Sequence, residues 1–488
     1  MNKRVLGNSL IYTVNDVLLK AFTFFLLPLY TAYLSTEDYG TTNLINSFTQ
    51  VSSYIIVFSL FMSVSRFYVE YKADEEKLKR YFGTMILFSF ASGFGFLLLF
   101  VVFNQVLSAL VFEGITFFPV VFVALLGLVF GCVYTMYSRI LYAMQDSKRV
   151  VITSTSFFFV NFGFTFLFVV RMGMGALGVL LATMIANILF CTYVLIDLKQ
   201  RKLIVFCMDK AILKETLQYS IPIIPHNIST NIAQLVSRVL IKNWATLSVV
   251  GLFGLASQFG TLTDIAQSSM NSAFQPWFFT QMQEGGEKKL AATRQMASAI
   301  AWLSGLIFLL IALFSHEVIL LFLNQNYREA WTVVPLSVAT FAIKSMYYPY
   351  INLLLYEKKA SRLVFITTVS SSLLNIALSA LLIPMLDMYG SALADIIAMM
   401  LRVVIAVIIA RKFNTAGFRI TAFLKVVLAV TLLSGIGLYF SYTRWMYDVS
   451  LLNIGYKLLI VAAYAGLVAW MNRSTLKRYI GAIKARRA

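Results

Sequence analysis

Long runs of apolar residues recur along the whole sequence, and they constrain its fold more than any other feature. A helix needs about 20 mostly apolar residues to cross the roughly 30 Å of hydrocarbon in a bilayer. The chain of 488 residues contains fourteen runs of that length. The predicted spans are 9–34, 41–69, 82–103, 116–143, 150–170, 175–196, 215–241, 249–279, 293–314, 331–355, 363–386, 390–410, 422–441 and 453–471. Because these runs are long and do not alternate apolar with polar residues, we predict an all-α integral membrane protein with about 14 transmembrane helices.

The composition agrees with this class. Only 12% of the residues are charged and 60% are hydrophobic, whereas a soluble domain carries roughly 25% charged residues. The opening MNKRVLGNSLIYTV enters the first span without a small-residue cleavage site, so we expect this span to be retained. The three cysteines show neither paired nor metal-binding spacing, and we predict no disulfide framework, no metal site and no cofactor.

Lysine and arginine predict the orientation, because cytoplasmic loops collect them. With the N-terminus in the cytoplasm, 29 of the 40 fall in or beside cytoplasmic loops, against four on the outer side. Both termini are then cytoplasmic, and the net charge of +19 reflects topology and contact with membrane lipids. It does not indicate nucleic-acid binding, which requires a basic soluble domain.

The sequence also repeats itself at an offset of about 211 to 215 residues. The stretch LSTEDYG ending at Gly40 corresponds to TLSVVG ending at Gly251, and LYAMQDSKR corresponds to LYEKKASR. Asn161 corresponds to Asn375, and MGALG to YGSAL. Since each repeat contains six spans, an even number, both halves enter the membrane from the same side, which predicts a parallel repeat.

The repeat predicts the domain organisation. Residues 1–198 form an N-terminal lobe of six helices, and residues 215–412 form a second such lobe. Residues 199–214 form an interfacial cytoplasmic linker, for which we expect an amphipathic helix. Residues 413–488 add two helices and a basic tail.

Four stretches resemble the polysaccharide transporters of the multidrug/oligosaccharidyl-lipid/polysaccharide (MOP) exporter superfamily, the Wzx-type flippases. They are PLYTAYLSTEDYG (28–40), YSIPIIPHNIS (219–229), SRVLIKNWATLSVVGLFGLA (237–256) and FLNQNYREAW (322–331). The resemblance implies two lobes around a cationic cavity and no enzymatic activity. It implies transport of an undecaprenyl-diphosphate-linked oligosaccharide across the bacterial cytoplasmic (inner) membrane, together with polysaccharide polymerase and assembly proteins. This chain departs from the family in having Ser237, where members often have an acidic residue before the arginine.

Charged residues inside the predicted spans are costly, about 2.5 to 3.5 kcal/mol each at the bilayer centre, so each requires an explanation. Arginine suits a diphosphate because its planar fork can bind two oxygens. The predicted cavity cations are Arg238, Arg402, Lys344, Lys20, Arg66 and Arg139. Pairing is the alternative for Lys20 with Asp16, Arg402 with Asp395 and Lys344 with Asp264. Extension to the lipid head groups is the alternative for Arg66, Arg139, Arg238 and Lys457.

Other polar residues are candidates for ion coupling or sugar binding. Coupling to H⁺ or Na⁺ would use Asp16, Asp264, Asp395 or His226, the last because imidazole titrates near neutral pH. Tyr347, Tyr348 and Tyr350 could stack on sugar rings, although interfacial anchoring also explains tyrosines at span ends.

Two other functions compete with the flippase. A multidrug or cation antiporter of the same superfamily would need an acid-rich lumen, whereas the deep charges number three cations against three carboxylates. A membrane enzyme would need catalytic residues on a sizeable loop, and the longest predicted outer loop, 315–330, is half apolar. No paired carboxylates, nucleophile motif or phosphate-binding glycine loop supports that class.

Overall fold

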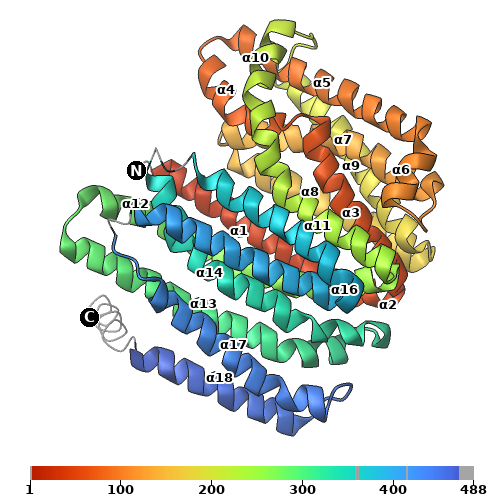
Figure 1. The fold of residues 1–488 in the computed structure, drawn as a ribbon. Helices are drawn as coiled ribbons and strands as arrows, with labels where there is room; N and C mark the ends of the chain where they lie inside the picture. The colour runs from red at the N-terminus through yellow and green to blue at the C-terminus, as the bar shows by residue number, and fades with distance from the viewer. Residues whose placement is uncertain (1–2, 358–359, 361, 414–415, 472–488) are drawn as a thin grey trace, which may run out of the picture. The chain divides into compact units, whose positions relative to one another are not determined.

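The computed structural model describes residues 3–357, 360, 362–413 and 416–471, and in this part of the chain every regular element is a helix (Figure 1). The all-α prediction is therefore confirmed. Nine of the described helices are long and apolar enough to cross a membrane. The total of fourteen spans stays a prediction.

The chain forms two compact units, Met1–Gly254 and Leu255–Ala488. The helices of the first unit are α1 (Lys3–Phe25), α2 (Leu27–Tyr33), α3 (Thr36–Ile56), α4 (Val64–Tyr71), α5 (Glu75–Val102), α6 (Asn104–Val111), α7 (Phe122–Ala143), α8 (Ser147–Thr165), α9 (Gly175–Gln200), α10 (Lys210–Ser220) and α11 (Ile224–Trp244). Short 3₁₀ or π segments are η1 (Leu60–Met62), η2 (Phe117–Val121), η3 (Phe166–Arg171) and η4 (Ile221–Ile223).

The second unit is built from longer helices. Helix α12 (Leu247–Glu284) begins in the first unit and continues into the second. It is followed by α13 (Glu287–Phe322), η5 (Gln325–Thr332), α14 (Val334–Tyr356), α16 (Val364–Arg411), α17 (Ile420–Thr443) and α18 (Leu451–Met471). A kink at Asp387, with φ of 47° and ψ of −128°, divides α16 into two segments. This kink lies between the predicted spans 363–386 and 390–410.

Several helix starts follow from local sequence. Ser35 and Asp38 form a reciprocal capping box at the start of α3, which satisfies two backbone N–H groups that would otherwise lack a partner. Asp74, Asp146 and Asp209 each accept a hydrogen bond from the first turn of α5, α8 and α10, respectively.

Some predicted spans are broken rather than continuous. The span 41–69 divides into α3 and α4 around Phe58 and Ser59, whose φ angles are positive. The span 215–241 divides into α10 and α11 at η4, where Pro222 lacks the N–H that a continuous helix would use. The apolar runs therefore predicted the positions of these segments but not the interruption at Phe58 and Ser59.

The linker prediction needs a correction. Residues 203–209 are not helical, and a helix begins only at Lys210. Backbone contacts with α5 replace the helical hydrogen bonds of this stretch: the Val205 N–H donates to the Lys79 carbonyl at 3.2 Å.

The predicted domain boundaries at 198 and 215 describe the repeat, whereas the compact units divide after Gly254. The difference arises because α11 packs against α3 in the first unit. The core of that unit includes a cluster of buried aromatic and aliphatic side chains around Tyr81, Phe82 and Met85 of α5, with Met136 of α7.

Candidate functional site

Two stretches that correspond in the repeat contact each other at the starts of α3 and α12. A Cβ placed on Gly40 would lie 1.8 Å from the Leu247 carbonyl oxygen, and one on Gly251 would lie 2.1 Å from the Thr36 carbonyl oxygen. Only glycine allows this approach, since either Cβ would overlap the facing backbone. Thr36 Oγ1 also donates to Ser248 Oγ at 3.0 Å. The contact is therefore reciprocal, as expected where a two-fold pseudo-axis passes between equivalent segments.

Lys344 and Asp264 form an ion pair between α14 and α12. The Lys344 Nζ to Asp264 Oδ1 distance is 2.6 Å, and the two side chains are 21% and 32% exposed. The ammonium group also lies 5.8 Å from the centre of the Tyr348 ring. The sequence left open whether Lys344 reaches Asp264; the structure makes this pair, within a single unit.

A small pocket lies near this pair. Tyr348 lines this pocket, and its ring also lies near the Lys344 ammonium group. Its polar lining includes Gln267, Asn271 and Ser304, and Asn271 accepts a hydrogen bond from Asn352 at 2.7 Å. The pocket thus combines amide and hydroxyl groups with an aromatic face, which are groups that bind sugars or other polar uncharged ligands.

Arg402 and Asp395 lie on the second segment of α16 and contact its first segment. Arg402 Nε donates to Ser371 Oγ at 2.9 Å, and Asn375 donates to Asp395 Oδ1 at 2.8 Å. Arg402 thus has a neutral partner at Nε, and Asp395 lies near enough to interact with its charge.

The three tyrosines occupy different environments. Tyr347 is 8% exposed and shares a hydrogen bond with Thr367, and Tyr350 is 2% exposed. Burial therefore prevents either ring from stacking on a sugar unless the helices move. Tyr348 remains the candidate for sugar stacking because it lines the pocket.

The candidate cations of the first unit lie nearer the surface. Lys20 and Arg139 are exposed. Arg66 is 57% exposed and lies 4.5 Å from the centre of the Tyr219 ring. Arg238 is half-buried and its Nη1 donates to the carbonyl of Gln234 one turn earlier.

Two further candidates for ion coupling, His226 and Asp16, belong to this unit. His226 is exposed at the start of α11. The side chain of Asp16 lies outside the described part of the structure. Among the described residues, no group of histidine, cysteine and acidic side chains could hold a metal ion.

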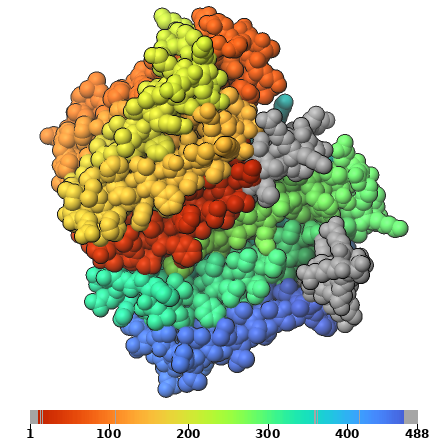
Figure 2. Space-filling model, turned by 180° about the vertical axis from the view of Figure 1, so that it is seen from behind, coloured from red at the N-terminus to blue at the C-terminus, as the bar shows by residue number. Residues whose placement is uncertain are grey.

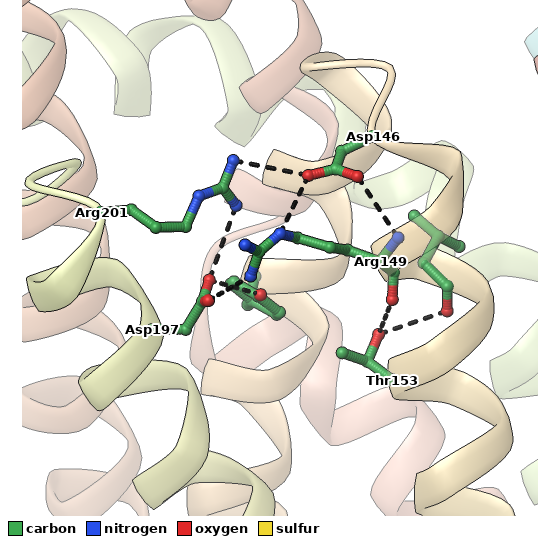
Figure 3. Close-up of polar contacts among 7 residues, drawn as sticks. Asp146, Arg149, Thr153, Asp197 and Arg201 are labelled. Carbon is green, nitrogen blue, oxygen red and sulfur yellow. Dashed lines mark hydrogen bonds and ion pairs between the residues drawn. The ribbon is translucent and has the colours of Figure 1, made fainter.

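A network of two aspartates and two arginines joins α8 and α9 near the turn after α7 (Figure 3). Arg149 pairs with Asp197 and, at 3.3 Å, with Asp146; Arg201 reaches both aspartates at 3.4 and 3.5 Å. Tyr137 donates to Asp197 Oδ2 at 2.8 Å. The charges balance within the network, which favours a structural role in fastening these helix ends over anion binding.

The expectation that Lys457 extends to the lipid head groups was wrong. The sequence placed it near an outer span end, from which it could reach the head groups, but its side chain is fully buried. Its Nζ lies 2.6 Å from Glu317 Oε1, and Asn453 donates to the same oxygen at 3.3 Å. Glu317 is not in an outer loop, because α13 continues to Phe322. This pair instead attaches α18 to α13.

A family model described as polysaccharide biosynthesis protein matches residues 5–282, more than half of the chain. The chain belongs to this family. No curated protein sequence matches it.

Solved structures show the fold of this family member. A lipid II flippase MurJ, in an inward closed conformation, is 15% identical, with a TM-score of 0.71 over 96% of this chain and 100% of that one. An inward-facing multidrug resistance MATE family transporter of the MOP superfamily is 15% identical, with a TM-score of 0.68 over 84% and 96%. The chain is thus a multi-pass membrane protein with a MOP fold, the fold of membrane transporters and flippases.

The sequence missed three features of this family member: the Gly40–Gly251 contact, the Asp146–Arg149 network and the buried Glu317–Lys457 pair. The repeat identified the two glycines as equivalent but not as neighbours. The stretch LYAMQDSKR contains Asp146 and Arg149, three residues apart, and this spacing was the available signal for the network.

Proposed function

We propose that the protein transports an undecaprenyl-diphosphate-linked oligosaccharide from the cytoplasmic to the outer leaflet of a bacterial cytoplasmic membrane, for cell-surface polysaccharide export. The observation that carries this proposal is the match of residues 5–282 to the polysaccharide biosynthesis family. Polysaccharide polymerase and assembly proteins would then act on the product. The Arg402 guanidinium supplies a cationic group of the kind that a diphosphate requires, and the Lys344 ammonium would supply a second one on leaving Asp264.

The mechanism we propose is alternating access by rocking of the two repeats, with the polyprenyl tail left in lipid. The reciprocal contact of Gly40 with Gly251 supports a closure at this end of the helices. The predicted topology places this end on the outer side, so the contact would break when the head group leaves. Coupling to H⁺ or Na⁺ through Asp264 or Asp395 is part of the same proposal.

A multidrug or cation antiporter is the second candidate, because MATE transporters share the fold. Such a protein holds a cationic substrate on carboxylates that are available to it. In this chain Asp264 is bonded to Lys344 and Asp395 accepts a hydrogen bond from Asn375. These contacts favour the flippase.

Reconstituted vesicles distinguish the two functions. One set contains a polyprenyl-diphosphate oligosaccharide, whose arrival in the other leaflet is measured with a sugar-specific enzyme; the other set contains a cationic dye. We expect lipid flipping without dye transport, and dye transport alone would overturn the proposal. Imposed H⁺ and Na⁺ gradients in the same vesicles test ion coupling.

Single alanine variants at Arg238, Arg402 and Lys344 test the cationic groups. We expect slower flipping at unchanged protein level. Full activity in all three variants would exclude a cationic binding region built on these residues.

A further inference from the structure

Residues 203–209, here called the strap, join α9 to α10 and cross α5 without forming a helix. Hydrogen bonds hold the strap on α5: Thr84 Oγ1 donates to the Cys207 carbonyl at 3.1 Å, and the Asp209 N–H donates to Thr84 Oγ1 at 3.0 Å. A Cβ on Gly83 would lie 1.8 Å from the Val205 carbonyl oxygen. The strap is therefore fitted to a glycine on α5 and has a defined position.

The strap turns apolar side chains outward. Val205, Phe206 and Met208 are 37%, 52% and 42% exposed, whereas Ile204 is buried. Exposed apolar side chains that are grouped in this way mark a surface that contacts a partner or a membrane. These side chains therefore require an apolar environment outside the unit.

The position of the strap along α5 identifies that environment. Helix α5 has 28 residues, about 42 Å at 1.5 Å per residue, which exceeds the roughly 30 Å of hydrocarbon. Its charged residues all lie between Glu75 and Arg80, and an uncharged run begins at Tyr81. The strap contacts α5 between Lys79 and Thr84, where the helix passes from head groups to hydrocarbon.

The surroundings of the strap are basic. Four exposed lysines flank it, two before and two after: Lys199, Lys202, Lys210 and Lys214. Segments 71–80 and 199–215 together contain nine lysines and arginines against five acidic residues. Figures 1 and 2 show α10 beside α4 and α5 at one end of the first unit. Tyr71 of α4 donates to Glu215 of α10 at 2.7 Å, which joins the two helices.

We propose that the strap is an interfacial anchor that binds anionic phospholipids. Val205, Phe206 and Met208 insert at the boundary of the acyl chains, and the flanking lysines bind the lipid phosphates. An apolar surface rimmed by lysines is the pattern of segments that lie in a membrane surface. The anchor attaches the connection between the two repeats to the leaflet and does not depend on which substrate the protein transports.

Fluorescent labelling of the full-length protein tests the insertion. Phe206→Cys, combined with Cys207→Ser, is labelled with an environment-sensitive fluorophore, while the buried Cys132 and Cys191 stay unreactive. The matched control is a label on Lys288→Cys in the same Cys207→Ser background, at an exposed position in the first turn of α13. Helices α12 and α13 have 38 and 36 residues, about 54 to 57 Å, and so extend beyond the bilayer into water.

In vesicles containing phosphatidylglycerol, we expect the label at 206 to emit at shorter wavelength than the label at 288. Spin-labelled lipid should quench it, and iodide should not. Equal quenching by iodide at the two positions would overturn the insertion. Gly83→Ala should increase iodide quenching at 206, whereas Gly95→Ala, where a Cβ meets no atom within 4 Å, should not.

Lipid selectivity tests the charged part of the proposal without disturbing the strap. Replacing the four flanking lysines by glutamine should lower the enrichment of phosphatidylglycerol over phosphatidylcholine in the protein's lipid shell, by up to about fivefold per lysine. Glutamine at Lys288 and Lys289 serves as the control and should leave the enrichment unchanged. Equal enrichment in the parent and in the fourfold variant would overturn lipid binding by these lysines.

Discussion

The Gly40–Gly251 contact gives the sharpest prediction about the transport cycle. In Gly40→Ala the new Cβ would lie 1.8 Å from the Leu247 carbonyl oxygen, whereas ordinary van der Waals contact begins at 3.4 Å. The helices must therefore separate by about 1.6 Å at this point. In Gly251→Ala the corresponding distance is 2.1 Å, and the required separation is about 1.3 Å.

The energetic consequence follows from the overlap. Overpacking of this kind costs about 1 to 3 kcal/mol, and the cost applies only to the conformation in which α3 and α12 touch. The substitution should therefore shift the equilibrium toward the separated conformation by about 5- to 150-fold. The free energy of unfolding should fall by less than this overpacking cost, because the separated conformation accommodates the methyl group.

Cysteine cross-linking measures this shift. Thr36 and Ser248 place their hydroxyl oxygens 3.0 Å apart, so Thr36→Cys/Ser248→Cys should form a disulfide readily. Adding Gly40→Ala should slow cross-linking at least fivefold. Adding Gly95→Ala, where a Cβ meets no atom within 4 Å, is the control and should not slow it. Equal cross-linking rates in the two backgrounds would refute the reasoning.

Three further predictions concern charges inside the helices. Lys457→Met leaves Glu317 buried without its partner and should lower the free energy of unfolding by about 3 to 5 kcal/mol; Lys457→Met/Glu317→Gln should recover most of this in thermal melts. Asp264→Asn leaves the Lys344 ammonium without its ion-pair partner and should slow flipping; wild-type flipping would exclude a role in coupling. Arg402→Lys should slow flipping even though the charge remains, because the planar fork is lost; equal rates would show that a point charge suffices.

The sequence predicted much of the architecture because local patterns determine it. Apolar runs located the helices, although the predicted spans 41–69 and 150–170 begin a few residues after α3 and α8, whose N-caps are Ser35 and Asp146. The break at Pro222 was also visible in the sequence. Positive φ angles at Phe58 and Ser59 were not, because neither residue type favours the left-handed region.

The contacts between distant segments could not be predicted in the same way. Glu317 and Lys457 are 140 residues apart. A hydropathy window averages only over residues that are adjacent in the sequence, so it cannot detect their contact. The predicted span 293–314 ended just before Ser315, His316 and Glu317, so Glu317 was assigned to an outer loop. Its burial depends on α18, whose position no local pattern determines. The same limit applies to Gly40 and Gly251, which the repeat related by equivalence alone.

Polar residues inside the predicted spans now divide into two groups. In α3, Thr42 and Ser47 donate to carbonyls of their own helix, at Tyr39 and Asn43. Such hydroxyls cost little in a membrane and leave a surface of small side chains, on which another helix can approach closely.

The other group consists of polar residues whose partners lie on a different helix or helix segment. Lys344 and Arg402 belong to it, since they donate to Asp264 on α12 and to Ser371 across the kink of α16. A helix movement breaks or forms bonds of this second kind and leaves the first kind unchanged. The residues that sense the transport cycle should therefore be found among the second group, and the hydroxyls of α3 should tolerate alanine with little effect on flipping.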